Sequence, residues 1–154
     1  MRSAAGILMI AISTLIGFML SIKYTERKKF YSDFYSFNKR YIECVSFSGD
    51  SLKKLLSENN SSGSDFYEYM QAFILDKTAV FKKKYLGADE SAFLYEYAAT
   101  LGRGDYETEK TKANVSLEKI KERKEKSVDD EKKYKPLLIK LGFLFGAIVF
   151  ILLI

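Results

Sequence analysis

The sequence predicts an all-α protein, with a helical-bundle domain between an N-terminal and a C-terminal transmembrane helix and a long charged final helix. Two observations support this class: both ends of the 154-residue chain are apolar, and apolar residues recur at helical spacing nearly everywhere between them. The apolar and polar alternation typical of strands does not compete seriously in any segment. The predicted parts are residues 1–22, 23–120, 121–136 and 137–154.

The first apolar stretch, Ala4 to Ile22, carries no charged residue. Its length corresponds to roughly 28 Å of helix, close to the thickness of the hydrocarbon core. A cleaved signal peptide is the alternative, but its apolar region is usually shorter and is followed by a small-x-small site. This stretch instead runs into Lys23 and Tyr24, so we expect an uncleaved anchor over residues 1–22.

The second apolar stretch, Leu141 to Ile154, corresponds to only about 21 Å of helix. It is long enough to span a bilayer if residues 137–139 join it and the Lys140 side chain extends its amine to the headgroups. The second transmembrane helix is therefore predicted over residues 137–154.

Basic residues flank both apolar stretches on their inner sides. The positive-inside rule then predicts that both termini lie outside and that residues 23–140 are cytoplasmic. An extracytoplasmic helical domain, acting as a sensor or adaptor between two spans, is the alternative. The flanking cations are Lys23, Arg27, Lys28, Lys29, Lys132, Lys133, Lys135 and Lys140.

Residues 23–120 are predicted to form one modest helical bundle. Its helices are expected at about residues 26–45, 51–58, 64–85 and 89–101, with Gly87 closing the third and a loop over residues 59–64. Ser64 or Asp65 is expected to cap the third helix. The apolar stripes that indicate these helices comprise Phe30, Phe34, Phe37, Tyr41 and Val45; Leu52, Leu55 and Leu56; Phe66, Met70, Phe73, Ile74, Val80 and Phe81; and Phe93, Leu94, Tyr97, Ala98 and Leu101.

The segment from Leu101 to Asp105 is predicted to be a tight interhelical turn. Gly102 is suited to the left-handed conformation that ends a helix, and Asp105 is suited to cap the next one. The final helix keeps an apolar stripe as far as Ile120, but residues 121–135 are almost entirely polar. We expect that part to be a solvated stalk supported by local pairs, with a kink or break at Pro136. The expected pairs are Glu122 with Lys126, Asp129 with Lys133, and Glu131 with Lys135.

Small residues at four-residue spacing occur in both predicted spans: Ser13 and Gly17 in the first, Gly142 and Gly146 in the second. Such pairs allow close helix packing, although glycine is also simply common in membrane helices. If Lys23 and Lys140 mark the same membrane boundary, Gly17 and Gly146 lie at equal depth. Whether the packing partner is in the same chain or in another copy stays open.

No catalytic, cofactor or metal site is indicated by the sequence. The chain has no histidine, no phosphate-binding loop and a single cysteine, so we expect no enzyme. Cys44 falls at an apolar helical position and is expected to be a small core residue. The 12 Phe and 11 Tyr follow helical stripes, which favours a core over stacking on nucleic acid. No nucleic acid is expected to bind.

The densest basic spot away from the membrane flanks is Lys82, Lys83 and Lys84. We interpret it as a solvated helix end, with binding to an acidic partner or anionic lipid as the functional alternative. The candidate partner-binding residues are therefore Lys82, Lys83, Lys84, Arg103 and Asp105.

Several segments resemble the stage III sporulation protein AB family of endospore-forming bacteria. They include the opening span followed by Lys23-Tyr24-Thr25-Glu26-Arg27, the turn Leu101-Gly102-Arg103-Gly104-Asp105, the long charged helix, and Lys140-Leu141-Gly142-Phe143-Leu144 before the last apolar run. Residues 47–90 match poorly. At Phe47 to Leu52 the family tends to have a proline-containing turn, which is absent here.

The resemblance implies more than the residues do by themselves. Members are similar to the platform proteins of type II secretion and type IV pilus systems. They have a helical cytoplasmic domain and belong to a complex that links mother cell and forespore. The implied function is a noncatalytic platform in the mother-cell membrane. It couples a secretion-type ATPase to other membrane components. Apart from the resemblance, the sequence leaves open whether the chain forms a homo-oligomer.

Overall fold

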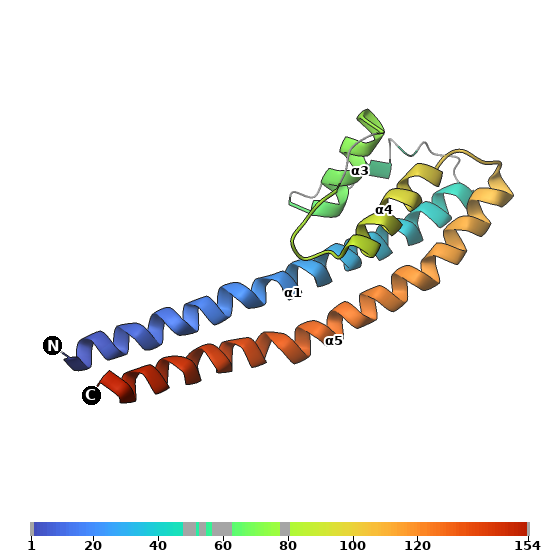
Figure 1. Cartoon of the computed structure of the whole chain (residues 1–154). Coiled ribbons are helices and arrows are strands. Elements are labelled where there is room, and N and C mark those ends of the chain that lie inside the picture. Colours follow the sequence, from blue (N-terminus) through green and yellow to red (C-terminus); the bar gives the residue numbers. More distant parts are fainter. Residues whose placement is uncertain (1, 48–51, 53–54, 57–62, 78–80, 154) are drawn as a thin grey trace. The chain divides into compact units, whose positions relative to one another are not determined.

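The computed structural model describes residues 2–47, 52, 55–56, 63–77 and 81–153, and all its regular elements are helices. They are α1 (Arg2–Phe47), α3 (Asp65–Leu75), α4 (Ala88–Thr100) and α5 (Tyr106–Leu153) (Figure 1). The predicted all-α class is confirmed. The chain forms two compact units, one of residues 1–28 with 126–154 and the other of residues 29–125.

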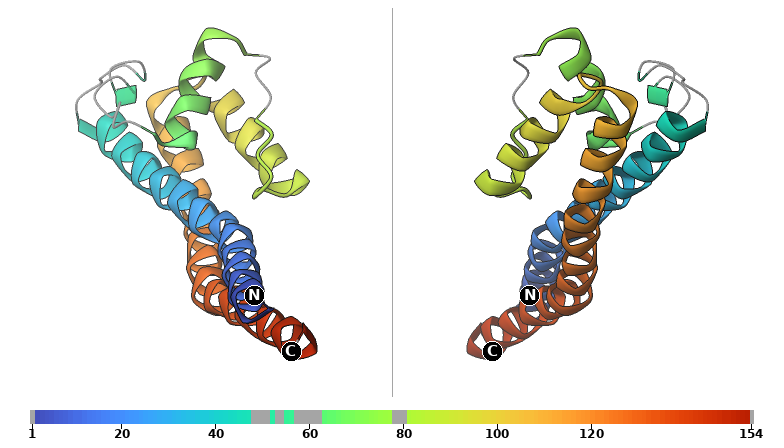
Figure 2. Two further views of the ribbon diagram at one scale, coloured as in Figure 1. Left: turned by 90° about the vertical axis from the view of Figure 1, so that its left-hand side faces the viewer. Right: turned by 90° about the vertical axis from the view of Figure 1, so that its right-hand side faces the viewer.

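The first unit is a pair of apolar helical segments. The N-terminal part of α1 and the C-terminal part of α5 lie side by side in Figure 1 and in both views of Figure 2, with the start of α1 near the end of α5. Both helices are long and apolar enough to cross a membrane. Large apolar side chains such as Leu15, Phe145 and Ile151 point outward and are more than half exposed, as expected for residues that face lipid.

The second unit has a core made mainly of aromatic rings. Phe34 is fully buried, and its ring stacks on Phe66 of α3 with centroids 4.8 Å apart and meets Tyr97 of α4 edge-on at 4.7 Å. Phe30 stacks on Phe81 at 5.5 Å. The stripe predicted over residues 26–45 therefore does form the central face of the bundle, and that helix is continuous with the first span.

The helix predicted over residues 64–85 is wrong in length, because α3 ends at Leu75 and Asp76 has an extended conformation. The carboxylate of Asp65, in the first turn of α3, accepts hydrogen bonds from Lys83 and Tyr85. One straight helix would hold residues 65 and 85 roughly 30 Å apart, so the chain must fold back. Gly87 does not close α3; it is the N-cap of α4, and its N–H donates to Glu90 Oε2 at 2.9 Å.

Other local predictions have mixed outcomes. The helix predicted over residues 89–101 corresponds to α4, and Gly102 has the predicted positive φ of 69°. Ser64 is the N-cap residue of α3, but its hydroxyl donates to Asp33 instead of capping the helix. Residues 51, 53–54 and 57–58 of the expected short helix, residues 59–62 of the expected loop, and Val80 lie outside the described residues. Leu55 and Leu56 are buried as predicted.

The sequence predicts a kink or break at Pro136, and the break is wrong, because α5 is one unbroken helix from Tyr106 to Leu153. The predicted solvated stalk also differs from the structure. Ser127 is 1% exposed, and the Tyr134 ring stacks on Tyr24 of α1 with centroids 5.3 Å apart. Tyr134 before the proline and the Leu138 backbone after it both lie against α1, at Tyr24 and Gly17. The missing N–H of the proline removes only one backbone hydrogen bond.

Candidate partner-binding surface and membrane helix contact

The turn that joins α4 to α5 is organised by one carboxylate, that of Glu109. Its oxygens accept hydrogen bonds from the backbone N–H groups of Gly102 at 2.9 Å, Arg103 at 3.1 Å and Gly104 at 2.8 Å. The hydroxyl of Tyr41, on α1, donates to the same carboxylate at 2.6 Å. Glu109 therefore fixes the conformation of the turn and ties it to α1.

Electrostatics favour the ionised form of Glu109. Burial alone would raise the pKa of its carboxyl, but the hydrogen bonds from Tyr41 and from the three backbone N–H groups together lower that pKa below its ordinary value. Burial, reinforced by the neighbouring carboxylate, raises the pKa of the Tyr41 phenol. The pair therefore stays as a carboxylate with a neutral phenol at neutral pH.

A second set of buried hydrogen bonds extends this network to α4. The Tyr97 hydroxyl donates to Asn38 Oδ1 at 2.7 Å, and Asn38 Nδ2 donates to the carbonyl oxygen of Ala113 at 2.9 Å. Asn38 is completely buried and Tyr97 nearly so. Buried polar groups are costly without partners, so this network specifies how α1, α4 and α5 pack.

The predicted partner-binding residues at the turn have different roles. Arg103 is exposed. Asp105 caps α5, since both the backbone and the hydroxyl of Thr108 hydrogen-bond to its carboxylate and lower its pKa. Capping accounts for Asp105, which leaves Arg103 as the turn's exposed cation.

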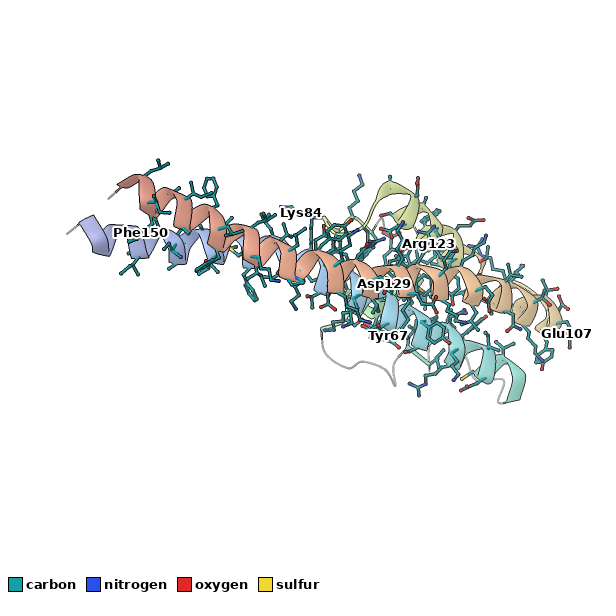
Figure 3. The ribbon with its side chains drawn as sticks, turned by 90° about the horizontal axis from the view of Figure 1, so that it is seen from below. Tyr67, Lys84, Glu107, Arg123, Asp129 and Phe150 are labelled. Carbon is teal, nitrogen blue, oxygen red and sulfur yellow. The ribbon has the colours of Figure 1, made fainter. Side chains whose placement is uncertain are left out.

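The basic spot at Lys82 to Lys84 is not a helix end, as expected from sequence, but part of the irregular segment between α3 and α4. Lys83 forms an ion pair with Asp65 at 2.8 Å, whereas Lys82 and Lys84 are exposed. Lys84, labelled in Figure 3, lies in this irregular segment. Of the three lysines, the outer two present charge to solvent.

A groove of about 350 Å³ between α4 and α5 was not anticipated from sequence. Phe93, Tyr97 and Val115 supply apolar surface, and Lys112 and Lys119 supply cations at its rim. Arg123 lies near α4 in Figure 3, with its guanidinium 4.8 Å from the centre of the Phe93 ring. Val115 is an exposed apolar residue between the polar side chains of Lys112 and Lys119.

The four small residues of the apolar segments lie at the contact between α1 and α5 of the same chain. A Cβ built at Gly142 would lie 2.6 Å from the Ser13 carbonyl oxygen and 3.3 Å from the Gly17 Cα, and one built at Gly146 would lie 2.7 Å from the Ile10 Cα. Phe150 packs on Gly6 near the start of α1 (Figure 3). Backbone approach this close requires glycine.

The register differs from the expected one, because Gly17 faces Gly142 and not Gly146. Tyr24 stacks on Tyr134, and Thr25 donates to Glu131 at 3.0 Å. Lys23 is thus level with residues near 135, and Lys140 lies about five residues, or roughly 7.5 Å, deeper. Lys140 does not mark the same boundary as Lys23.

An ion-pair cluster joins α1 and α5 directly beside the apolar segments. Arg27 pairs with Asp130 at 2.7 Å and Lys28 with Glu131 at 2.7 Å. Glu131 also pairs with Lys135 at 3.5 Å, and this is one of the three i,i+4 pairs predicted from the sequence. The hydrogen bond from Lys28 is the main cause that lowers the pKa of the Glu131 carboxyl.

A family model described as stage III sporulation protein AB matches residues 56–154, more than half of the chain. The chain belongs to the stage III sporulation protein AB family. Searches of the curated proteins and of the solved structures gave no match. The matched range contains the turn at Leu101 to Asp105, all of α5, and Lys140 to Leu144. The resemblance predicted from these segments is confirmed, and this is a sporulation protein.

The part of the chain that the structure describes contains no group of three or more histidine, cysteine or acidic side chains placed to hold a metal ion. Two of its carboxylates have structural partners: Glu109 accepts hydrogen bonds from Tyr41 and from the turn, and Glu131 pairs with Lys28 and Lys135. The described residues also present an exposed turn, an adjoining groove and two apolar helices.

Proposed function

We propose that this protein is a noncatalytic membrane platform of a secretion-like sporulation complex, and that it couples a cytoplasmic secretion-type ATPase to membrane components. Family membership and the two apolar helices support a role at a membrane during sporulation. The observation that carries the coupling role is the Glu109 network, which ties the exposed turn to α1 and α5.

The physical basis of coupling is helix continuity. α1 runs unbroken from Arg2 to Phe47 and α5 from Tyr106 to Leu153, so each helix contributes to both compact units. A partner that displaces the turn acts on the start of α5 through Glu109 and on α1 through Tyr41. Hydrogen-bonded helices transmit such displacements without requiring chemistry in this chain.

The partner's contact surface is proposed at the exposed cations Lys82, Lys84 and Arg103. Among the described residues, none of the three has a carboxylate within ion-pair distance. A partner with an acidic surface would satisfy them at little desolvation cost if they lie at the rim of the interface. The α4 and α5 groove, with apolar Phe93 and Val115, adds an anchor site of the kind that interface cores use.

Copurification tests the platform role. Full-length tagged protein, extracted with mild detergent from sporulating cells, should retain a secretion-type ATPase. A K82Q/K84Q/R103Q variant should retain several-fold less, and a matched K121Q variant, on the exposed part of α5, should retain as much as wild type. Equal retention by the triple variant would remove this surface, and absence of any ATPase from wild type would reject the platform role. Two differently tagged copies in the same extract report whether a homo-oligomer forms.

The proposed location is the mother-cell membrane, with residues 23–140 cytoplasmic and both termini outside. Thiol labelling tests this topology. Ala92 is exposed on α4, so A92C in a Cys44→Ala background should resist a membrane-impermeant thiol reagent in spheroplasts and react after lysis. R2C, near the N-terminus, is the matched control and should react in both. Labelling of A92C in intact spheroplasts would favour the alternative, an extracytoplasmic sensor or adaptor domain.

A further inference from the structure

The two apolar helical segments leave a groove of about 550 Å³ between them. It is almost entirely apolar, and its larger lining residues include Ile16, Leu20, Leu138, Leu141, Phe145 and Ile148. From Leu138 to Ile148 the groove follows roughly 15 Å of helix, about half of the ~30 Å hydrocarbon thickness. Its extent thus corresponds to one leaflet of a bilayer.

One helical turn beyond Leu20 and Leu138, the groove ends at a stacked pair of phenols. Tyr24 follows Leu20 by four residues and Tyr134 precedes Leu138 by four, so both rings lie on the groove side of their helices. Their centroids are 5.3 Å apart. Neither phenol hydroxyl has a hydrogen-bond partner among the described residues of the protein.

A lysine ammonium also lies over each of the two tyrosine rings. Lys23 Nζ lies 5.0 Å from the centre of the Tyr24 ring, and Lys133 Nζ lies 5.2 Å from that of Tyr134. The neighbouring cations Arg27, Lys28 and Lys135 are neutralised by carboxylates, whereas Lys23 and Lys133 are exposed and form no ion pair within the described chain. Positive charge and hydroxyl donors are therefore concentrated at the end of an apolar groove.

We propose that this groove binds one anionic phospholipid, with an acyl chain between α1 and α5 and the phosphate at Lys23, Tyr24, Tyr134 and Lys133. The apolar groove is as long as one leaflet is thick, and cations and phenols lie at its headgroup end. This arrangement matches the shape and charge of such a lipid. A third helix is the competing occupant. Its most favourable contacts, Gly17 and Gly142, are already used against each other.

Native mass spectrometry of the full-length protein in detergent tests the proposal. With added phosphatidylglycerol we expect one bound lipid per chain, and with phosphatidylcholine at the same concentration about fivefold less. A K23Q/K133Q variant should lose roughly thirtyfold in affinity for phosphatidylglycerol, since each lysine near an anionic surface contributes about 1 kcal/mol, or roughly fivefold. Equal occupancy by the two lipids, or by the variant, would overturn the headgroup assignment.

Lys132 supplies a matched control. Lys132 is next to Lys133 and so lies at nearly the same level along α5. It precedes Leu141 by nine residues, or two and a half helical turns, which places it on the face of α5 opposite the groove. K132Q should therefore bind phosphatidylglycerol as wild type does, and an equal loss in K132Q would mean only diffuse attraction to the charged region.

Filling the groove with a larger side chain tests whether an acyl chain binds there. L20W should reduce lipid occupancy, and I22W, on the same helix outside the groove, should not. Glycerol phosphate at millimolar concentration should not displace the lipid; displacement would assign the site to a free phosphate. A lipid-independent dimer that L20W abolishes would assign the groove to a second copy and reject the lipid.

Discussion

The phenol of Tyr41 donates a 2.6 Å hydrogen bond to the carboxylate of Glu109, which also receives the backbone N–H groups of the turn before it. Glu109 is 6% exposed, so water cannot readily replace these donors. Replacing the carboxylate with Glu109→Gln should destabilise the full chain by about 2 kcal/mol, since hydrogen bonds to charged groups contribute about 1.5–3 kcal/mol. Thermal unfolding in detergent micelles, followed by circular dichroism, measures the change. Glu107→Gln, at an exposed position on the same helix, is the control and should change stability by less than about 0.5 kcal/mol.

The same carboxylate predicts an acid dependence of stability. Because the pKa of Glu109 is lower in the folded chain than its ordinary value of 4.5, its contribution is fully present above that value and is lost as pH falls through the folded pKa. Asp65, whose pKa is also lowered, acts in the same direction. Unfolding temperatures, measured from pH 7 down to pH 3, should decrease once the pH is below about 4.5. The fall should be shallower in Glu109→Gln, and an identical profile for both proteins would contradict this assignment.

The central ring of the aromatic core is Phe34, which is fully buried against Phe66 and Tyr97. Phe34→Ala should cost about 3–5 kcal/mol because it leaves a cavity among rigid rings. Chemical unfolding of the full chain in mixed micelles checks this value. Val115→Ala, at a position 59% exposed, should cost less than about 1 kcal/mol, and a comparable loss in both variants would contradict the core assignment.

The contact between Gly17 and Gly142 should not tolerate a methyl group. A Cβ at Gly142 would lie 2.6 Å from the Ser13 carbonyl oxygen, a backbone atom that cannot rotate away. Gly142→Ala should therefore separate the two helices locally and lower stability by about 1–3 kcal/mol. Ala11→Val adds carbon to an exposed position of α1 and should be near neutral. Thermal unfolding in micelles compares the two.

Glu131 accepts from Thr25 at 3.0 Å and from Lys28 at 2.7 Å, so one carboxylate serves several donors of the facing helix. Glu131→Gln should destabilise the helix pair by about 1 kcal/mol, and the effect should shrink in 1 M salt because these charges are partly exposed. Asp129→Asn, at an exposed position two residues away, is the control. A salt-independent loss would show that packing, and not charge, dominates at Glu131.

Much of the helical content was predictable because it depends on local periodicity. The stripe beginning at Phe30, the left-handed Gly102 and the cap at Asp105 each follow from spacing or backbone preference within a few residues. The error in the predicted length of α3 arose because the chain conformation there depends on contacts that are not local. Apolar residues such as Phe81 and Tyr85 continue the helical spacing, but they reach the core from a folded-back segment because Lys83 and Tyr85 bind Asp65.

Some residues of the candidate sites could likewise be recognised from local sequence, and others could not. The sequence singled out Gly17, Gly142 and the turn at Arg103, since small residues and turn residues are recognisable by type. It missed Glu109, because a glutamate in the first turn of a helix is usually explained by the helix dipole alone. Its role depends on Tyr41, 68 residues earlier in the chain.

The all-α class and the two apolar helices follow from the sequence alone, because hydrophobic period and span length are properties of single segments. Which residues face each other depends on how distant segments pack. The tertiary structure placed Gly17 against Gly142, carried α5 unbroken through Pro136, and paired residues 126–135 with α1. These outcomes depend on contacts between distant segments, whose backbone approach and paired charges outweigh the local preference of a proline or a charged run.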